Sequence, residues 1–216
     1  MNARKILTAA ALLLWASSSL AGISIDSDSL TIIDRGWVSE FTGSVRIRGE
    51  HFSVDSDRAV SDRRTGEITA YGNVHIAYSS GTHHMQGWCG ESRIDDEAKK
   101  FYLFNDVKTV FNTEEGQRAV TYADSVEVSY TVPGTAVYTG SVRAEIEEML
   151  ITADKAVYSE EENSVVFTGN PSGRSVSEGT RSEYSGDVIR VFLEDEKVNI
   201  EGGAKTRVWI EDEPQM

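Results

Sequence analysis

A five-residue motif with a central glycine returns at nearly regular intervals along the chain. Its copies lie 29 to 35 residues apart, and three of them keep both the glycine and a valine two positions later. These three are Phe41-Thr-Gly-Ser-Val45, Ala70-Tyr-Gly-Asn-Val74 and Tyr138-Thr-Gly-Ser-Val142, and weaker copies span residues 103–107, 167–171 and 200–204. A period of this length is typical of repeat architectures, in which each unit buries its apolar face against the next. The motif therefore predicts one continuous stacked fold.

An acidic residue forms a second mark in the repeat, 15 or 16 residues before the next glycine position. It is Asp57, Asp124, Asp154 or Asp187, and Gly90 takes the equivalent place before Asn105. The chain lacks the Gly-rich nine-residue period of calcium-binding repeats. We therefore expect these aspartates to cap turns or face solvent, and we assign none of them to a metal.

Apolar and polar residues alternate around the motifs. The alternation covers residues 41–48, 67–78, 120–132 and 198–210, and clusters of Gly, Asn, Asp and Ser separate these segments. Such a pattern is typical of half-buried antiparallel strands, whereas helical spacing is not evident after residue 21. We expect an all-β domain with about three short strands in each repeat, since strands average five to six residues.

The repeated glycines fall in the same phase as the apolar residues. A glycine on the inward face of a strand marks either a bend or the close approach of another group. Two interpretations remain at this stage: the glycines let each sheet turn a sharp corner, or they contact a ligand directly. We favour the first.

Composition excludes several classes of protein. The 216 residues are 39% hydrophobic and 26% charged, which suits a folded domain and excludes a disordered polymer or a multi-span membrane protein. The net charge of −14 argues against a nucleic-acid partner, because phosphate binding needs a basic face. A single cysteine excludes an intrachain disulfide and a thiolate-rich metal cage.

The first 21 residues have the three parts of a secretory signal peptide. Arg4 and Lys5 precede the apolar stretch 6–15, and small residues end in a cleavage pattern at Ala21. An uncleaved anchor is the alternative, but a membrane span needs about twenty apolar residues. We therefore expect cleavage, export to the periplasm, a mature domain over residues 22–210 and a solvated acidic tail over 211–216.

Catalytic motifs are not evident in the sequence. The chain shows no nucleophile elbow, no phosphate-binding Gly-rich loop and no His-Glu-x-x-His zinc motif. His83, His84 and Cys89 form the one cluster of soft ligands, but their spacing fits no standard zinc site. We expect a protein that is not an enzyme, with no catalytic residues, no metal and no cofactor.

The order and spacing of these segments resemble the LptA/OstA-like family of periplasmic lipopolysaccharide-export proteins. The resemblance covers residues 23–210. It rests on Ile23-Ser-Ile25-Asp-Ser-Asp28, Phe52-Ser-Val-Asp-Ser-Asp57-Arg-Ala59, Ile151-Thr-Ala-Asp154-Lys-Ala-Val-Tyr158 and Val165-Val-Phe-Thr-Gly169.

That resemblance implies an open-ended, twisted β-jelly-roll of about 16 stacked antiparallel strands. It also implies a carrier that moves lipopolysaccharide, or a related glycolipid, from the inner to the outer membrane with its acyl chains inside the roll. The partners would be the inner- and outer-membrane components of the export machinery. The alternation assigns ten residues to the apolar, ligand-binding interior: Ile23, Ile25, Phe41, Val45, Ile47, Val74, Ile76, Val128, Val142 and Ile151.

Two further expectations concern alternatives to this picture. The same repeats suit a non-catalytic envelope scaffold with a fully packed interior, which would differ from a carrier by holding no lipid.

The segments Ile23–Ile25 and Arg207–Ile210 are the first and last expected strands, and both are apolar in the inward phase. Their unpaired edges predict head-to-tail self-association, unless the acidic tail covers the last strand.

Overall fold

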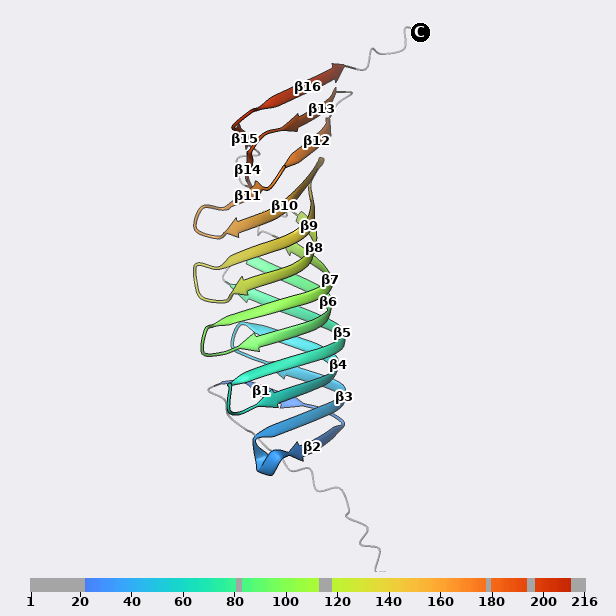
Figure 1. Ribbon diagram of the computed structural model, residues 1–216, viewed down its shortest axis with the longest axis vertical. Coiled ribbons are helices and arrows are strands. Elements are labelled where there is room, and N and C mark those ends of the chain that lie inside the picture. Colours follow the sequence, from blue (N-terminus) through green and yellow to red (C-terminus); the bar gives the residue numbers. More distant parts are fainter. Residues whose placement is uncertain (1–21, 81–82, 113–117, 178–179, 194–196, 211–216) are drawn as a thin grey trace, which may run out of the picture.

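The computed structural model describes residues 22–80, 83–112, 118–177, 180–193 and 197–210. The predicted signal peptide and acidic tail lie outside these residues. The described chain forms one antiparallel sheet of 16 strands, stacked along the long axis of the molecule (Figure 1). The predicted all-β, open-ended stack is thus confirmed. No helix in the described chain is long and apolar enough to cross a membrane.

The strands follow one another along the stack in nearly the order of the sequence. Their bounds are β1 (Ser24–Asp26), β2 (Ser29–Ile33), β3 (Val38–Arg48), β4 (Phe52–Asp62), β5 (Glu67–Ser80), β6 (His83–Asp95), β7 (Lys100–Asn112), β8 (Arg118–Ser129), β9 (Thr135–Ile146), β10 (Met149–Ser159), β11 (Ser164–Thr168), β12 (Ser172–Ser177), β13 (Thr180–Ser185), β14 (Val188–Phe192), β15 (Lys197–Glu201) and β16 (Lys205–Ile210), with a short 3-10 turn η1 (Asp34–Gly36) after β2.

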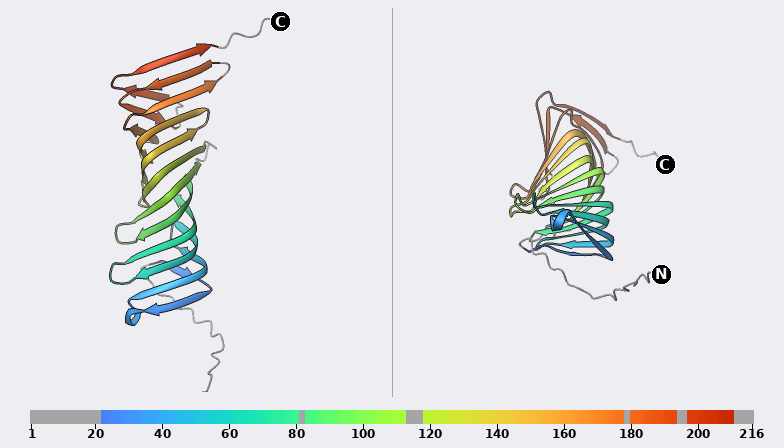
Figure 2. Two further views of the ribbon diagram at one scale, coloured as in Figure 1. Left: turned by 45° about the vertical axis from the view of Figure 1, so that its right-hand side comes forward. Right: turned by 60° about the horizontal axis from the view of Figure 1, so that its bottom comes forward.

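The long strands β3 to β10 bend in the middle, so that each one contributes to two walls. The pairing between successive long strands shifts register at the bend, which is the mark of a β-bulge. Seen from near one end, the bends lie above one another (Figure 2). We call the halves that stack with β2, β11, β14 and β15 the first wall, and those that stack with β1, β12, β13 and β16 the second wall.

The repeats contain fewer and longer strands than the sequence predicted. From β3 to β10 each repeat holds two strands of 11 to 14 residues, and the prediction of three short ones is wrong here. The reason is that a bulge bends a strand without ending its ladder. Beyond β10 the bend does interrupt the strands. Pro171 lies in the gap between β11 and β12, where a residue without an N–H cannot continue the ladder.

The core lies between the two walls and runs through the stack as a single cluster of buried side chains. Phe101 and Phe167 are its largest fully buried members. Rings from opposite walls meet in it: Phe52 of the second wall lies 6.3 Å from Phe101, and Phe111 lies 4.6 Å from Tyr158, between ring centroids. Each such buried side chain contributes roughly 1.5–3 kcal/mol of hydrophobic stabilisation, so the walls hold each other in place.

Candidate functional site between the two walls

A line of bulges, each built from a glycine and an aspartate, joins the walls. Gly72 on β5 has a φ of +74°, and a Cβ added there would lie 2.6 Å from a carboxylate oxygen of Asp57 on β4. Asn73, which follows it, donates a hydrogen bond of 2.8 Å to the same carboxylate. The contact between a glycine and an aspartate recurs at four other bends: Asp28 with Gly43, Asp124 with Gly140, Asp154 with Gly169 and Asp187 with Gly202. Of these, Asp154 also accepts a hydrogen bond of 3.3 Å from the asparagine after the glycine, Asn170.

The aspartates therefore have a role that the sequence did not predict. They are exposed to solvent, as expected, but each one faces the glycine of the neighbouring strand and does not cap a turn. The glycines take the corner-forming role that we favoured, because their φ values lie in the left-handed region and the pairing shifts register beside them. We call this line of Gly–Asp pairs the spine.

In one repeat the glycine and the residue that faces it have exchanged strands. Asn105 on β7 occupies the usual glycine position with a φ of +68°, and the partner on β6 is Gly90. A Cβ at Gly90 would lie 3.1 Å from the Cβ of Asn105, so the side chain now comes from the opposite strand. Asparagine is one of the few residues that tolerate this backbone conformation, which is why the exchange keeps the bend.

The ten residues assigned to the interior all lie on the inward side of the walls. Nine are buried, with exposed fractions of 0% to 7%, and Ile25 is half-buried against the same cluster. Phe41 and Val128 belong to the first wall, and the other eight belong to the second wall. The fold brings them together along one continuous core, which does not by itself test whether they contact a ligand.

The sequence reasoning missed much of the first wall. Phe101, Leu103 and Ile189 are completely or almost completely buried there, and Tyr138 on β9 is a buried member of the same wall. Their signal was the same alternation of apolar and polar residues, which holds for Phe101 and Leu103 on β7 and for Ile189 and Val191 on β14. The Thr109 hydroxyl of the second wall donates a hydrogen bond of 3.1 Å to the Tyr138 hydroxyl across the interior.

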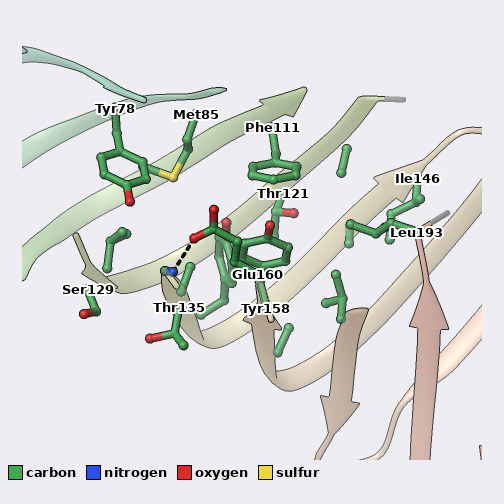
Figure 3. A pocket seen from close by; sticks show the side chains of 18 residues that line it. Tyr78, Met85, Phe111, Thr121, Ser129, Thr135, Ile146, Tyr158, Glu160 and Leu193 are labelled. Atoms are coloured by element: carbon green, nitrogen blue, oxygen red, sulfur yellow. Dashed lines mark hydrogen bonds between the residues drawn. The ribbon is translucent and has the colours of Figure 1, made fainter. Parts of the chain in front are cut away.

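A small cavity of about 40 Å³ remains between the walls (Figure 3). Met85, Phe111 and Ile146 line it from the second wall, and Tyr158 and Leu193 line it from the side of the first. Of the ten assigned residues, Val128 alone lines this cavity.

A few polar groups also line the cavity. The Glu160 carboxylate accepts a hydrogen bond from the backbone N–H of Gly134, and the side chains of Ser129 and Thr135 lie near it (Figure 3). Burial, followed by the charge of Glu160, raises the pKa of Tyr158 above its ordinary value, so its phenol stays neutral at physiological pH. The lining thus suits an apolar occupant.

Cys89 and His84 of the soft-ligand cluster do not face one another. Cys89 is buried on the inward side of β6, and its thiol donates a hydrogen bond of 3.1 Å to the backbone oxygen of Glu91. His84 lies exposed on the outer side of the same strand, with Nδ1 2.6 Å from the Ser79 hydroxyl. The side chain of His83 lies outside the described part of the structure. Across the described residues, no group of three or more His, Cys, Asp or Glu could hold a metal ion.

The interior is apolar as far as both ends of the stack. At the first end the inward residues Leu30 and Ile32 of β2 are 41% and 65% exposed. At the last end Val208 and Ile210 of β16 are 57% and 77% exposed. They are exposed because no further described strand covers them.

Each end of the sheet presents two edge strands. In the described chain β1 and β2 pair only with β3, while β15 pairs only with β14 and β16 only with β13. The predicted first and last strands, β1 and β16, are therefore edges of the second wall. The edges of the first wall, β2 and β15, were not predicted, because the sequence does not show that the walls separate at the ends.

Comparison with known proteins gives the following matches. A family model described as "LptA/(LptD N-terminal domain) LPS transport protein" matches residues 24–197. Among solved structures, LptH, described as the LptA homologous periplasmic component of the lipopolysaccharide transport device from Pseudomonas aeruginosa, is 11% identical. That alignment covers 88% of this chain and 95% of LptH, with a TM-score of 0.23. No curated protein matches the chain.

Proposed function

Because this chain belongs to the LptA/LptD N-terminal domain family of lipopolysaccharide transport proteins, we propose that it is a non-catalytic lipid carrier. It shelters the acyl chains of lipopolysaccharide, or of a related glycolipid, between its two walls. The observation that carries this proposal is the apolar interior that continues to both ends of the stack. Each CH₂ group withdrawn from water there gains about 0.8 kcal/mol, which favours carriage inside the roll.

Loading requires the walls to part. A cavity of about 40 Å³ is far below the 300–1,000 Å³ of typical ligand sites and is too small for an acyl chain. The spine holds the walls on one side, so they open most easily on the other. There the contacts that must yield are cross-wall ring pairs such as Phe111 with Tyr158 and Phe52 with Tyr130, whose centroids lie 4.6 and 5.3 Å apart.

Transport across the periplasm would need several copies in series. The N-terminal edge strands of one copy and the C-terminal edge strands of another both offer unpaired backbone groups, which can continue the two walls. The inward residues Leu30, Ile32, Val208 and Ile210 would then be covered, and the apolar interior would become continuous. Such a head-to-tail bridge between inner and outer membrane components is the arrangement that we propose.

Photocrosslinking in cells tests the carrier. A photoreactive residue in place of Val128 or Val142 on the inward side should form adducts with glycolipid. The same residue in place of Thr139, which is exposed on the outer side of β9, should form none and serves as the matched control. Inward variants that fold normally and give no adduct would contradict the proposal.

A packed envelope scaffold is the second candidate function, and the small size of the cavity favours it. The two candidates differ in what the purified protein contains. Mass spectrometry of the gently extracted, folded protein should detect bound acyl chains if it is a carrier and none if it is a scaffold.

A further inference from the structure

Aromatic and basic side chains alternate in a row on the outer face of the second wall. Trp88, Lys108, Tyr122 and Arg143 are in-register partners on the adjacent strands β6 to β9. Lys108 Nζ lies 5.5 Å from the ring centroid of Trp88 and 5.9 Å from that of Tyr122, and Arg143 Cζ lies 5.7 Å from the latter. His75 also stacks on Trp88, with ring centroids 5.1 Å apart, so neighbouring side chains cover the ring faces, and the 38% of Trp88 and 36% of Tyr122 that remain exposed lie at the ring edges. We call this row the outer strip.

The same row continues into a hollow on the outer face of the last strands. Arg143 pairs with Thr152 on β10, which pairs with Ser172, and the row ends at Lys205 on β16. The hollow has a volume of about 520 Å³, which lies within the 300–1,000 Å³ of typical ligand sites. Hydroxyl and basic groups line it: Thr152, Ser172, Ser185, Arg174, Lys205 and Arg207.

The basic groups of the hollow outnumber its acids. In the described chain no ion pair is formed by Arg174, Lys205 or Arg207. The one acid in the lining, Glu183, is the in-register neighbour of both Arg174 and Arg207, and its carboxylate pairs with Arg181 at 2.5 Å. This local excess of positive charge stands out in a chain whose net charge is −14. Guanidinium groups bind carboxylate and phosphate oxygens through two parallel hydrogen bonds, so the hollow suits anionic groups.

We propose that the outer strip and the hollow together bind an extended acidic glycan. Pyranose rings would pack against the exposed edges of Trp88 and Tyr122, which neighbouring side chains hold in place, so that little side-chain entropy is lost. Two adjacent strand spacings, roughly 9.5 Å, separate these residues, so the strip can follow several consecutive sugars. The acidic substituents farther along the chain meet Arg174, Lys205 and Arg207.

The glycan of this site is separate from the proposed lipid cargo. The outer strip and the interior lie on opposite faces of the second wall, as shown by Trp88, which is exposed between the buried residues Gly87 and Cys89. A sugar attached to acyl chains in the interior would have to pass around a margin of the wall. The site therefore does not depend on the proposed function and would exist in a scaffold as well.

Titration with two glycans of the same backbone tests this site on the full mature chain. Peptidoglycan glycan strands freed of their peptides carry a carboxylate on every second sugar, whereas chitin oligosaccharides of equal length carry none. We expect the acidic strands to bind on the order of tenfold more tightly, because their carboxylates accept charge-assisted hydrogen bonds from the basic groups of the hollow. Added salt should weaken binding of the acidic strands alone.

Substitutions separate the two parts of the site. Arg174→Gln with Arg207→Gln should lower the affinity for the acidic strands about tenfold without affecting chitin binding, and Trp88→Ala should weaken both. The matched controls are Arg63→Gln with Lys155→Gln for charge and Trp37→Ala for an exposed ring; these residues are exposed and lie off the outer strip. Circular dichroism checks that each variant is folded.

Two results would overturn the proposal. The first is binding that the site variants and their controls reduce equally, or no binding of either glycan. The second is that the sugar part of lipopolysaccharide, freed of its lipid, binds at the strip while the acidic strands do not, because the site would then belong to the cargo.

Discussion

At the scale of single residues, the spine depends on space as well as on backbone conformation. A glycine in the left-handed region avoids a penalty of about 1–2 kcal/mol that most residues pay there. The aspartate on the next strand fills the volume that the absent side chain leaves, so one position can gain a side chain only if its partner loses one. The natural exchange between Gly90 and Asn105 follows this rule.

The exchange predicts a rescue by a double substitution. Gly72→Asn alone should destabilise the fold by roughly 1–2 kcal/mol or more, because the new side chain meets the carboxylate of Asp57. Combining it with Asp57→Gly should restore much of the loss, since the pair then has the arrangement of Gly90 and Asn105. Urea unfolding of the two single variants and the double variant measures the coupling. Strictly additive losses would show that the two positions act independently.

The thiol of Cys89 offers a test of the packed interior. Burial is the main cause that raises its pKa to about 11 from 9.0, so the native state favours the neutral thiol. The resulting stability is fully present below about pH 9 and is lost as the pH rises toward 11. We expect iodoacetamide to alkylate the native protein at pH 8 at least a hundredfold more slowly than the protein in urea. Equal rates would mean that the interior opens readily around β6.

At the scale of elements, the alternation of apolar and polar residues predicted which residues are extended, but it did not predict where each strand begins and ends. Alternation identified residues 67–78 as extended, and they lie in β5. It could not show that the chain continues through Gly72 as one strand, because a bulge and a turn both use glycine. The partner 15 residues earlier was visible as Asp57, but its contact with Gly72 depends on the register of two strands.

The last strand is the element on which self-association depends. Val208 and Ile210 of β16 face inward yet are mostly exposed, so replacing both with Lys should leave the fold intact. Charges on that face would have to be buried against the next copy, which is costly, and the substitution should abolish concentration-dependent oligomers. Sedimentation velocity measures the outcome. Val176→Lys, on the exposed outer face of β12, is the control and should leave self-association unchanged. Oligomers that persist in the double variant would contradict edge pairing through β16.

At the scale of the whole molecule, overall charge opposes the proposed assembly. Copies with a formal charge of −14 repel one another, and salt screens this repulsion within a Debye length of about 10 Å at 0.1 M. Raising the ionic strength from about 0.01 M to about 0.15 M should therefore lengthen the oligomers, as light scattering can measure. The same increase in ionic strength should weaken the binding of acidic glycan strands at the outer strip. Shorter oligomers at higher salt would indicate that charge pairs, and not edge strands, hold the copies together.

Only part of the candidate site could be predicted from the sequence, because the site is formed by residues that lie far apart along the chain. Strand phase correctly placed Val74 and Ile151 on the inward side, because phase is local. The cavity is not local: Phe111 and Tyr158 meet across the walls although 47 residues separate them along the chain. The outer strip was missed for the same reason, since its side chains come from four strands.

The spine makes the molecule a rod whose length depends only on the number of its repeats. Each repeat forms its bend from its own glycine and its own aspartate or their exchanged equivalents, so no repeat needs a distant partner to set the angle between the walls. Adding one pair of long strands would lengthen the rod by two strand spacings, roughly 9.5 Å, and leave its cross-section unchanged. Duplication or deletion of about thirty residues can therefore change the length of such a molecule without changing its apolar interior.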